Sequence, residues 1–354
     1  MKGLLFFTDM HLHLWSRFSK PVNDPYLVND RFSQQIKVLN DILDYAESND
    51  YGIINGGDLF HTRGAVDSRV LYSATEAIAS HPNVPITIVR GNHDSINNQM
   101  GSPASIDALA FLPNVTIVSN PDSMDIEVDG KSIHINFMPY GEDITSMKDV
   151  LKGFSDSLSP NDYNILVAHL GIDGAKQGLS THRLASAFSL GDLYPDKYNA
   201  VYLGHFHLRQ KLADNVWYGG STMQLTFNDE GQEKGFDTLT FEKGNPIWKF
   251  HKVDYTPFIT LTSWHEGDEE KYAGYYVNLK LPAEEAKVAR KADVKDTNIQ
   301  ITAKVEDHTK ARLNINPNTG VAEVTKKYTD KFFPELTHAA QDVIQDVLSG
   351  GDDK

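Results

Sequence analysis

The sequence contains no cysteine. Disulfide bonds, thiolate metal sites and cysteine nucleophiles are therefore excluded. It also lacks any apolar run approaching the roughly 18 residues that a membrane-spanning helix needs. The apolar N-terminal run is too short for a signal peptide, because Asp9 and His11 interrupt it where a cleavage region would lie. From these absences we expect a soluble, cytoplasmic protein that is not secreted.

Positive charge is also scarce. The chain has 33 Lys and Arg residues against 48 Asp and Glu residues, a formal net charge of −15. Because nucleic-acid-binding surfaces are ordinarily basic, this composition taken alone disfavours such a partner. Two arrangements would remove the conflict: bound divalent cations that offset carboxylates locally, or a partner subunit that supplies the basic surface.

The first 255 residues predict a mixed α/β domain. Short β-branched runs alternate with amphipathic helices up to residue 89, and a hairpin with a tight turn at Asp129-Gly130 follows. Strands are predicted at 4–7, 52–54, 85–89, 115–118, 124–128, 131–137, 165–167, 200–203, 216–218, 237–241 and 247–253, and helices at 31–48, 67–80 and 144–154. We expect a sandwich of two mixed sheets flanked by helices.

Two smaller segments follow this domain. Residues 256–316 predict a small α/β unit, with strands at 275–281 and 298–305 around a helix near 283–292. Residues 317–354 predict only helix and a frayed tail. The helix carries an apolar stripe, which suits docking on its own domain and partner binding about equally. The stripe consists of Leu336, Ala339, Ala340, Val343, Ile344 and Leu348.

Polar side chains with metal-binding atoms follow five of the predicted strands. The segments are Thr8-Asp9-Met10-His11, Gly56-Gly57-Asp58, Gly91-Asn92-His93-Asp94, Ala168-His169 and Gly204-His205-Phe206-His207. The carboxyl ends of strands in α/β folds are where sites are built. Each motif alone is ordinary, since Asn, Asp and Gly are also turn residues. Together and in this order they indicate one site.

The donor atoms of these segments are oxygen and nitrogen, with no sulfur. Mixed donors of this kind suit manganese, iron or zinc rather than soft metals. Seven ligands are too many for one ion, whereas two ions sharing a carboxylate, about 3.5–4 Å apart, use them well. The predicted ligands are Asp9, His11, Asp58, Asn92, His169, His205 and His207.

This series of motifs resembles that of the calcineurin-like metallophosphoesterase superfamily over residues 1–255. More narrowly, Gly57-Asp58-Leu59-Phe60-His61 resembles the nuclease branch. This branch comprises the SbcD-type subunit of bacteria and phages and its eukaryotic and archaeal meiotic-recombination counterparts. The resemblance implies a DNA nuclease with 3′-to-5′ exonuclease and endonuclease activity, two metal ions (usually Mn²⁺, with Mg²⁺, Fe²⁺ or Zn²⁺ as alternatives) and a role in DNA repair and recombination. It further implies a homodimer formed through 67–80 and 105–112, a DNA-facing cap at 256–316, and a C-terminal segment that binds an SbcC/Rad-type ABC ATPase.

The resemblance also implies a role for each site residue. Asp9, His11 and His207 would bind the first metal, Asn92, His169 and His205 the second, and Asp58 both. His93 would stabilise the transition state or protonate the leaving 3′-oxygen, with His61 as a second helper histidine. Asp94 would orient a histidine from behind the ligands.

Alternatives remain at this stage. The chain could be a stand-alone metallophosphoesterase acting on a small phosphodiester, nucleotide or phosphoprotein, or a scaffold that has lost its metals, although no ligand is missing. His61 could simply cap a turn or face solvent. Several loop cations near the ligands could contact phosphates, although scattered surface charge is the default interpretation: Arg63, Lys176, Arg183, Arg209 and Lys211.

Overall fold

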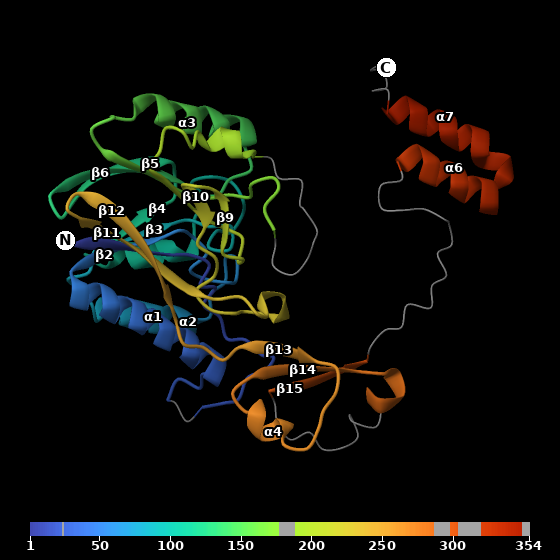
Figure 1. Ribbon diagram of the computed structural model, residues 1–354, viewed down its shortest axis with the longest axis horizontal. Coiled ribbons are helices and arrows are strands. Elements are labelled where there is room, and N and C mark those ends of the chain that lie inside the picture. Colours follow the sequence, from blue (N-terminus) through green and yellow to red (C-terminus); the bar gives the residue numbers. More distant parts are fainter. Residues whose placement is uncertain (23–24, 177–187, 287–297, 304–319, 349–354) are drawn as a thin grey trace. The chain divides into compact units, whose positions relative to one another are not determined.

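The structure is a computed structural model that describes residues 1–22, 25–176, 188–286, 298–303 and 320–348 (Figure 1). The chain divides into two units, residues 1–303 and residues 304–354. Within the described ranges, no helix combines the length and the apolarity that crossing a membrane demands. Arg183 and part of the helix predicted at 283–292 lie outside the described residues.

Six strands form the first sheet, in the order β12-β11-β1-β2-β3-β4. The four strands β1 to β4 are parallel, whereas β11 runs antiparallel to β1 and β12 antiparallel to β11. The parallel strands therefore end at the same edge of the sheet. The strands are β1 (Gly3–Phe7), β2 (Tyr51–Asn55), β3 (Ile86–Val89), β4 (Val115–Val118), β11 (Gly235–Glu242) and β12 (Asn245–Lys252).

The second sheet also has six strands, in the order β5-β6-β7-β8-β10-β9. A hairpin joins β5 to β6, the strands β6, β7, β8 and β10 are parallel, and β9 pairs antiparallel with β10. The strands are β5 (Asp122–Val128), β6 (Lys131–Met138), β7 (Tyr163–His169), β8 (Ala200–Gly204), β9 (Gln210–Ala213) and β10 (Val216–Tyr218).

Alternate residues of β1 face different layers, as the two-residue period of a strand requires. Leu5 and Phe7 pack with the helices α1 (Asp30–Asn49) and α2 (Ser68–Ala79), whereas Leu4 and Phe6 pack between the sheets. On the opposite side, Met147 of α3 (Ile144–Ser157) packs on the second sheet. Figure 1 shows α1 and α2 on one side of the sandwich and α3 on the other. The predicted mixed α/β sandwich of two sheets flanked by helices is confirmed.

Capping residues set the two ends of α1, which lie close to the predicted range of 31–48. The Asn29 side chain accepts a hydrogen bond from the backbone N–H of Phe32, a normal N-cap. Asp50 ends the helix in the left-handed region with φ of 58°. No sequence pattern signals β9, which is short and polar and is defined by its pairing with β10. In the described part of residues 1–303, short 3₁₀ helices lie in the loops at Ser105–Phe111, Leu190–Leu193 and Phe227–Asp229.

The predicted α/β unit after residue 255 contains three parallel strands, with one more strand than expected. They are β13 (Phe258–Leu261), β14 (Tyr276–Leu281) and β15 (Ile299–Ala303), and a one-turn helix, α4 (Asp268–Lys271), lies between the first two. Phe258 and Tyr276 pack against Phe18 and lie over the guanidinium of Arg31, at 5.4 Å each. These contacts join the small sheet to the N-terminal loop and α1.

The second unit is helical where it is described. It contains α6 (Val321–Phe332), a 3₁₀ turn (Pro334–Leu336) and α7 (Thr337–Leu348). Within the predicted stripe, Leu336 and Val343 are 51% and 62% exposed. Tyr328 and Phe332 of α6 are exposed as well.

Candidate metal centre

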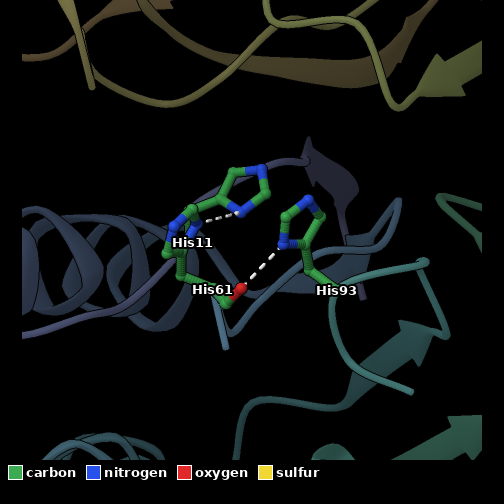
Figure 2. A group of neighbouring side chains, drawn as sticks. All are labelled: His11, His61 and His93. Atoms are coloured by element: carbon green, nitrogen blue, oxygen red, sulfur yellow. Dashed lines mark hydrogen bonds between the residues drawn. The ribbon is translucent and has the colours of Figure 1, made fainter. Parts of the chain in front are cut away.

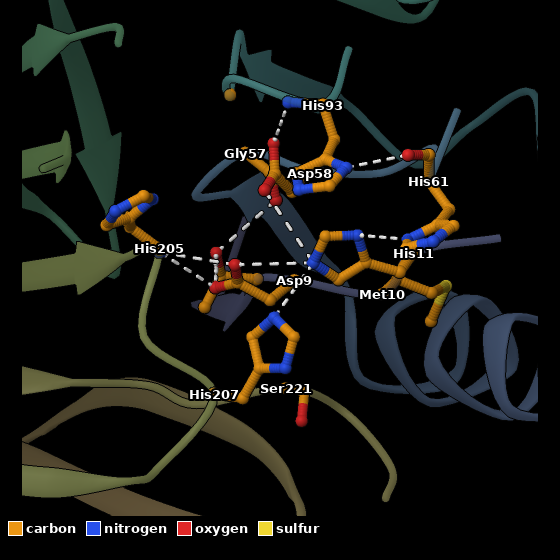
Figure 3. A network of polar contacts seen from close by, with 12 residues as sticks. Asp9, Met10, His11, Gly57, Asp58, His61, His93, His205, His207 and Ser221 are labelled. Carbon is orange, nitrogen blue, oxygen red and sulfur yellow. Dashed lines mark hydrogen bonds and ion pairs between the residues drawn. The ribbon is translucent and has the colours of Figure 1, made fainter. Parts of the chain in front are cut away.

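The predicted ligands lie in the loops at the carboxyl ends of parallel strands from both sheets. Asp9 and His11 follow β1, Asp58 follows β2, and Asn92 follows β3. From the second sheet, His169 ends β7, and His205 and His207 follow β8. Figure 3 shows His11 joined by dashed lines to Asp9, Asp58 and His207, and the His205 backbone joined to Asp9.

The backbone at this site is unusual. Asp9, His11 and Asp58 have positive φ values of 52°, 49° and 54°. Left-handed backbone in residues other than glycine is costly and tends to persist at functional sites. Position 91 also requires glycine, since a Cβ there would lie 2.0 Å from Asp58 Oδ1. Only glycine lets the loop after β3 approach the aspartate this closely.

Asp58 lies between the two halves of the ligand set. Its Oδ2 is 3.6 Å from His11 Nε2 and 3.3 Å from His169 Nε2, and its Oδ1 accepts a hydrogen bond from the His93 backbone N–H at 2.8 Å. Burial opposes ionisation of Asp58, but the neighbouring imidazoles, led by His169, hold the pKa of this carboxyl far below its usual range. The Asp58 carboxylate is therefore ionised and lies between the two groups of predicted ligands.

The first half of the set contains Asp9, His11 and His207. One ligand atom of each lies within 4.8 Å of the others, and His11 Nε2 is 3.0 Å from His207 Nε2. Burial lowers the pKa of His11 well below its usual value. A neutral imidazole has a free lone pair, which is the form that binds metal.

The second half contains Asn92, His169 and His205. Asn92 Oδ1 is 3.2 Å from His169 Nε2 and 2.9 Å from His205 Nδ1. His169 donates from Nδ1 to the Gly56 carbonyl at 2.8 Å, which leaves Nε2 facing the centre. Burial, with the charge of His169, lowers the pKa of His205 to about 3. Burial also opposes the charged form of His169, but Asp58 and Asp9 outweigh it and raise the pKa of that imidazole to about 9.

The donor set fits divalent cations. All seven predicted ligands come together, their donors are carboxylate, amide and imidazole atoms, and Asp9, Asp58 and His169 also form a group within 4.8 Å. Asp9 is buried, which raises its pKa, and nearby Asp58 raises it further. Two buried carboxylates side by side are stabilised by a cation between them.

His93 and His61 lie beside this cluster (Figure 2). His93 donates from Nδ1 to the His61 carbonyl oxygen at 2.7 Å, so its Nε2 is the atom free to exchange a proton. The two rings stack at 5.2 Å and 16°, and His61 Nδ1 is 3.3 Å from His11 Nδ1. Burial, His93 and His13 lower the pKa of His61 to about 4. His61 therefore contacts the cluster rather than facing solvent.

Asp94 differs from its predicted role. Its carboxylate accepts hydrogen bonds from the backbone N–H groups of Asp58, Phe60 and Gly91, at 2.9, 3.0 and 3.0 Å. These partners are backbone groups and not a histidine. Asp94 therefore joins the loops after β2 and β3. Burial, together with Asp58, raises its pKa to about 7.

Sequence reasoning missed two supports of the site. The Trp15 ring lies 4.5 Å from the His61 ring, 5.2 Å from the His13 ring and 4.8 Å from the Arg31 guanidinium. Lys234, fully buried and paired with Asp229, donates to the His207 carbonyl at 2.6 Å. Neither residue lies in a motif. An aromatic residue in the polar loop after β1 was the only available signal, and it is a weak one.

Residues 3–209 match the calcineurin-like phosphoesterase family, and the chain belongs to that family. The predicted resemblance to the superfamily is confirmed, and the protein is a phosphoester hydrolase with a candidate divalent-metal centre. It is similar to exonuclease subunit 1 of Enterobacteria phage T4, with 30% identity over 250 residues that cover 64% of this chain and 68% of that relative.

Two further similarities are weaker or less specific. The putative phosphoesterase 078R of Invertebrate iridescent virus 3 is 30% identical over 178 residues, which cover 49% of this chain and 48% of that protein. The crystal structure of a hypothetical protein from Thermus thermophilus covers 71% of this chain and 100% of its own, with 14% identity and a TM-score of 0.39. The last similarity is too low to support an inference.

Proposed function

We propose that this chain is the nuclease subunit of a DNA repair and recombination complex, a two-metal DNA phosphodiesterase with 3′-to-5′ exonuclease and endonuclease activity. The observation that carries the proposal is the position of Asp58 Oδ2, which is within 3.6 Å of His11 Nε2 and 3.3 Å of His169 Nε2. These histidines belong to different halves of the ligand set, and this position of Asp58 supports a carboxylate shared by a pair of ions.

In this proposal Asp9, His11 and His207 hold one ion, Asn92, His169 and His205 hold the other, and Asp58 holds both. The ions, Mn²⁺ by preference, would activate water at neutral pH and neutralise charge on the phosphate. The protein's own residues do the remaining work. His93, whose Nδ1 is held by the His61 carbonyl, protonates the leaving 3′-oxygen from Nε2. His61 keeps His93 in position through that carbonyl and the stacked ring.

The assembly is part of the proposal. The exposed apolar residues of α6 and α7, such as Tyr328 and Val343, support a partner-binding role for the C-terminal segment. The phage relative is named as one subunit of an exonuclease, which supports a second subunit. We infer that the partner is an SbcC/Rad-type ABC ATPase, that the nuclease forms a homodimer, and that residues 256–316 face the DNA.

A Mn²⁺-dependent assay tests the activity. We expect hydrolysis of linear duplex DNA to exceed that of a small aryl phosphodiester at equal phosphodiester concentration. A clear preference for the small substrate would favour the second candidate, a stand-alone phosphoesterase. The similarity to the iridescent-virus phosphoesterase supports that candidate.

A further inference from the structure

A cavity of about 430 Å³ lies apart from the metal ligands. Its lining comes from the edge strand β9, its flanking residues and β10 in one sheet, and from β11 and β12 in the other. The lining residues are Arg209, Gln210, Lys211, Asp214, Trp217, Asp237, Trp248 and Phe250. The volume is typical of sites for small molecules.

The guanidinium of Arg209 is held in a fixed plane. Nη1 and Nη2 donate to the two carboxylate oxygens of Asp237 at 2.5 and 2.8 Å, and Asp237 is buried. The Phe250 ring lies 4.2 Å from the guanidinium carbon. With one edge bound to the carboxylate and one face on Phe250, the group still lines the cavity and remains 29% exposed. A fixed guanidinium plane of this kind is a stacking surface for a flat ring.

Two tryptophans build the aromatic wall. The Trp217 and Trp248 rings meet edge to face, 4.7 Å apart at 81°. Trp248 is held by a hydrogen bond from its Nε1 to Tyr163 Oη at 3.1 Å. The wall is therefore set before any ligand binds, which lowers the entropy lost on binding.

The charges of the lining cancel. Arg209 pairs with Asp237, and Lys211 pairs with the exposed Asp214 at 3.0 Å. A phosphate would find no net positive charge here. A neutral flat ring would instead find stacking surfaces. Gln210 is held in place, because its Oε1 accepts from the Lys176 N–H and its Nε2 donates to the Lys176 carbonyl.

We propose that this cavity binds one unstacked nucleobase of single-stranded DNA. Arg209 follows His207 by two residues, at most about 7 Å of extended chain, so the base would belong to a nucleotide close to the one at the metal centre. This inference rests on the proposed function, because it names a single-stranded end as the substrate form. Stacking tolerates any base, so binding here is independent of sequence.

The test uses the full chain in EDTA, so that no cleavage occurs, and a short thymidine oligonucleotide. A single abasic residue is moved along the oligonucleotide one position at a time, and affinity is measured by tryptophan fluorescence. We expect one position at which loss of the base weakens binding by about tenfold. Arg209→Lys keeps the positive charge and loses the planar stacking surface, so the penalty at that position should disappear.

The matched control is Lys249→Gln. Lys249 is an exposed cation next to Phe250 on β12 that does not line the cavity. This variant should keep the position-dependent penalty. Equal affinity for every abasic oligonucleotide with the wild-type chain, or an unchanged penalty in Arg209→Lys, would overturn the proposal.

A second measurement needs no variant and covers the case in which Arg209→Lys does not fold. Photo-crosslinking with 5-iodouracil at the critical position should attach the base to Trp217, Trp248 or Phe250, and crosslinks confined to other residues would overturn the proposal. Metal-dependent hydrolysis of DNA, assayed separately, tests the proposed function. Hydrolysis without the base-dependent binding rejects the cavity alone, whereas base-dependent binding without hydrolysis supports the cavity and rejects the nuclease.

Discussion

Replacing Asp58 by asparagine should weaken the binding of the two proposed metal ions while keeping the shape of the site. The asparagine side chain retains an oxygen that can accept from the His93 backbone N–H, which now binds Asp58 Oδ1 at 2.8 Å. The negative charge is lost, and an NH2 group replaces Oδ2, the oxygen that faces His11 and His169. The substitution thus tests the shared carboxylate rather than packing.

The magnitude follows from the distances. A unit charge 3.3–3.6 Å from the Asp58 oxygen, as the two imidazole nitrogens are, interacts with it by about 5 kcal/mol at an effective dielectric constant of about 20. A cation bound within the same cluster loses an interaction of this order. We therefore expect Mn²⁺ affinity to fall by about a thousandfold.

Equilibrium dialysis followed by elemental analysis measures the result. The wild-type chain should hold two Mn²⁺ ions, and Asp58→Asn should hold fewer than one under conditions that saturate the wild type. Asp125→Asn is the control, because Asp125 is an exposed carboxylate that also contacts a histidine, His134. Two ions bound to Asp58→Asn with unchanged affinity would refute the shared carboxylate.

Four further predictions follow from the site. His93→Ala should lower kcat by about 10²- to 10⁴-fold while metal stoichiometry stays at the wild-type value, and unchanged turnover would reject its role as proton donor. Gly91→Ala places a Cβ 2.0 Å from Asp58 Oδ1 and should lower the free energy of unfolding by at least about 1–3 kcal/mol in denaturant titrations. The control is Gly153→Ala on α3, where no atom lies within 4 Å of the added Cβ, and this variant should not lower the free energy of unfolding. Trp15→Ala removes the ring beside His61 and should reduce kcat up to about a hundredfold with little change in KM, with Trp15→Phe restoring most of it; an equal loss in both variants would argue against stacking. The pKa of His61 is lowered from 6.5 to about 4, so between these pH values the unfolded chain binds a proton that the folded chain does not bind. The free energy of unfolding of the metal-free protein should therefore fall as pH drops from 6.5 to 4, and it should fall less steeply in His61→Gln. Identical slopes in urea titrations would contradict this.

The strand ends were predictable because two local signals coincide. The short β-branched run Ile86–Val89 is followed, after Arg90, by Gly-Asn-His-Asp, so the strand and the ligands are both read from neighbouring residues. The strand β9 could not be predicted in this way, because its four residues lack an apolar pattern. It forms a strand because it pairs with β10. The edge strands β4, β5 and β12 were predicted because they have apolar patterns of their own, which β9 lacks.

The supports of the site could not be read in this way. Trp15 lies in a loop, and its contact with His61 joins residues that are far apart in the sequence. The buried amine of Lys234 is satisfied by Asp229, by Gln232 Oε1 and by the His207 carbonyl. Such contacts depend on the completed fold, and no spacing in the chain encodes them. The partners of Asp94 are of the same kind, since a carboxylate that accepts from backbone N–H groups leaves no sequence pattern.

The residues with left-handed backbone explain why the motifs that contain Asp9 and Asp58 act as one unit. Beyond β1 and β2 the pairing continues through the loops: Asp9 N–H donates to the Gly57 carbonyl at 3.0 Å, and His11 N–H donates to the Asp58 carbonyl at 3.0 Å. Each positive φ costs on the order of 1–3 kcal/mol, and this continued ladder offsets it. Since hydrogen bonds and not the ions hold these loops, the ligand geometry should exist before metal binds. Metal affinity then depends little on reorganisation, and a change at Gly57 or Asp58 must alter both halves of the centre together.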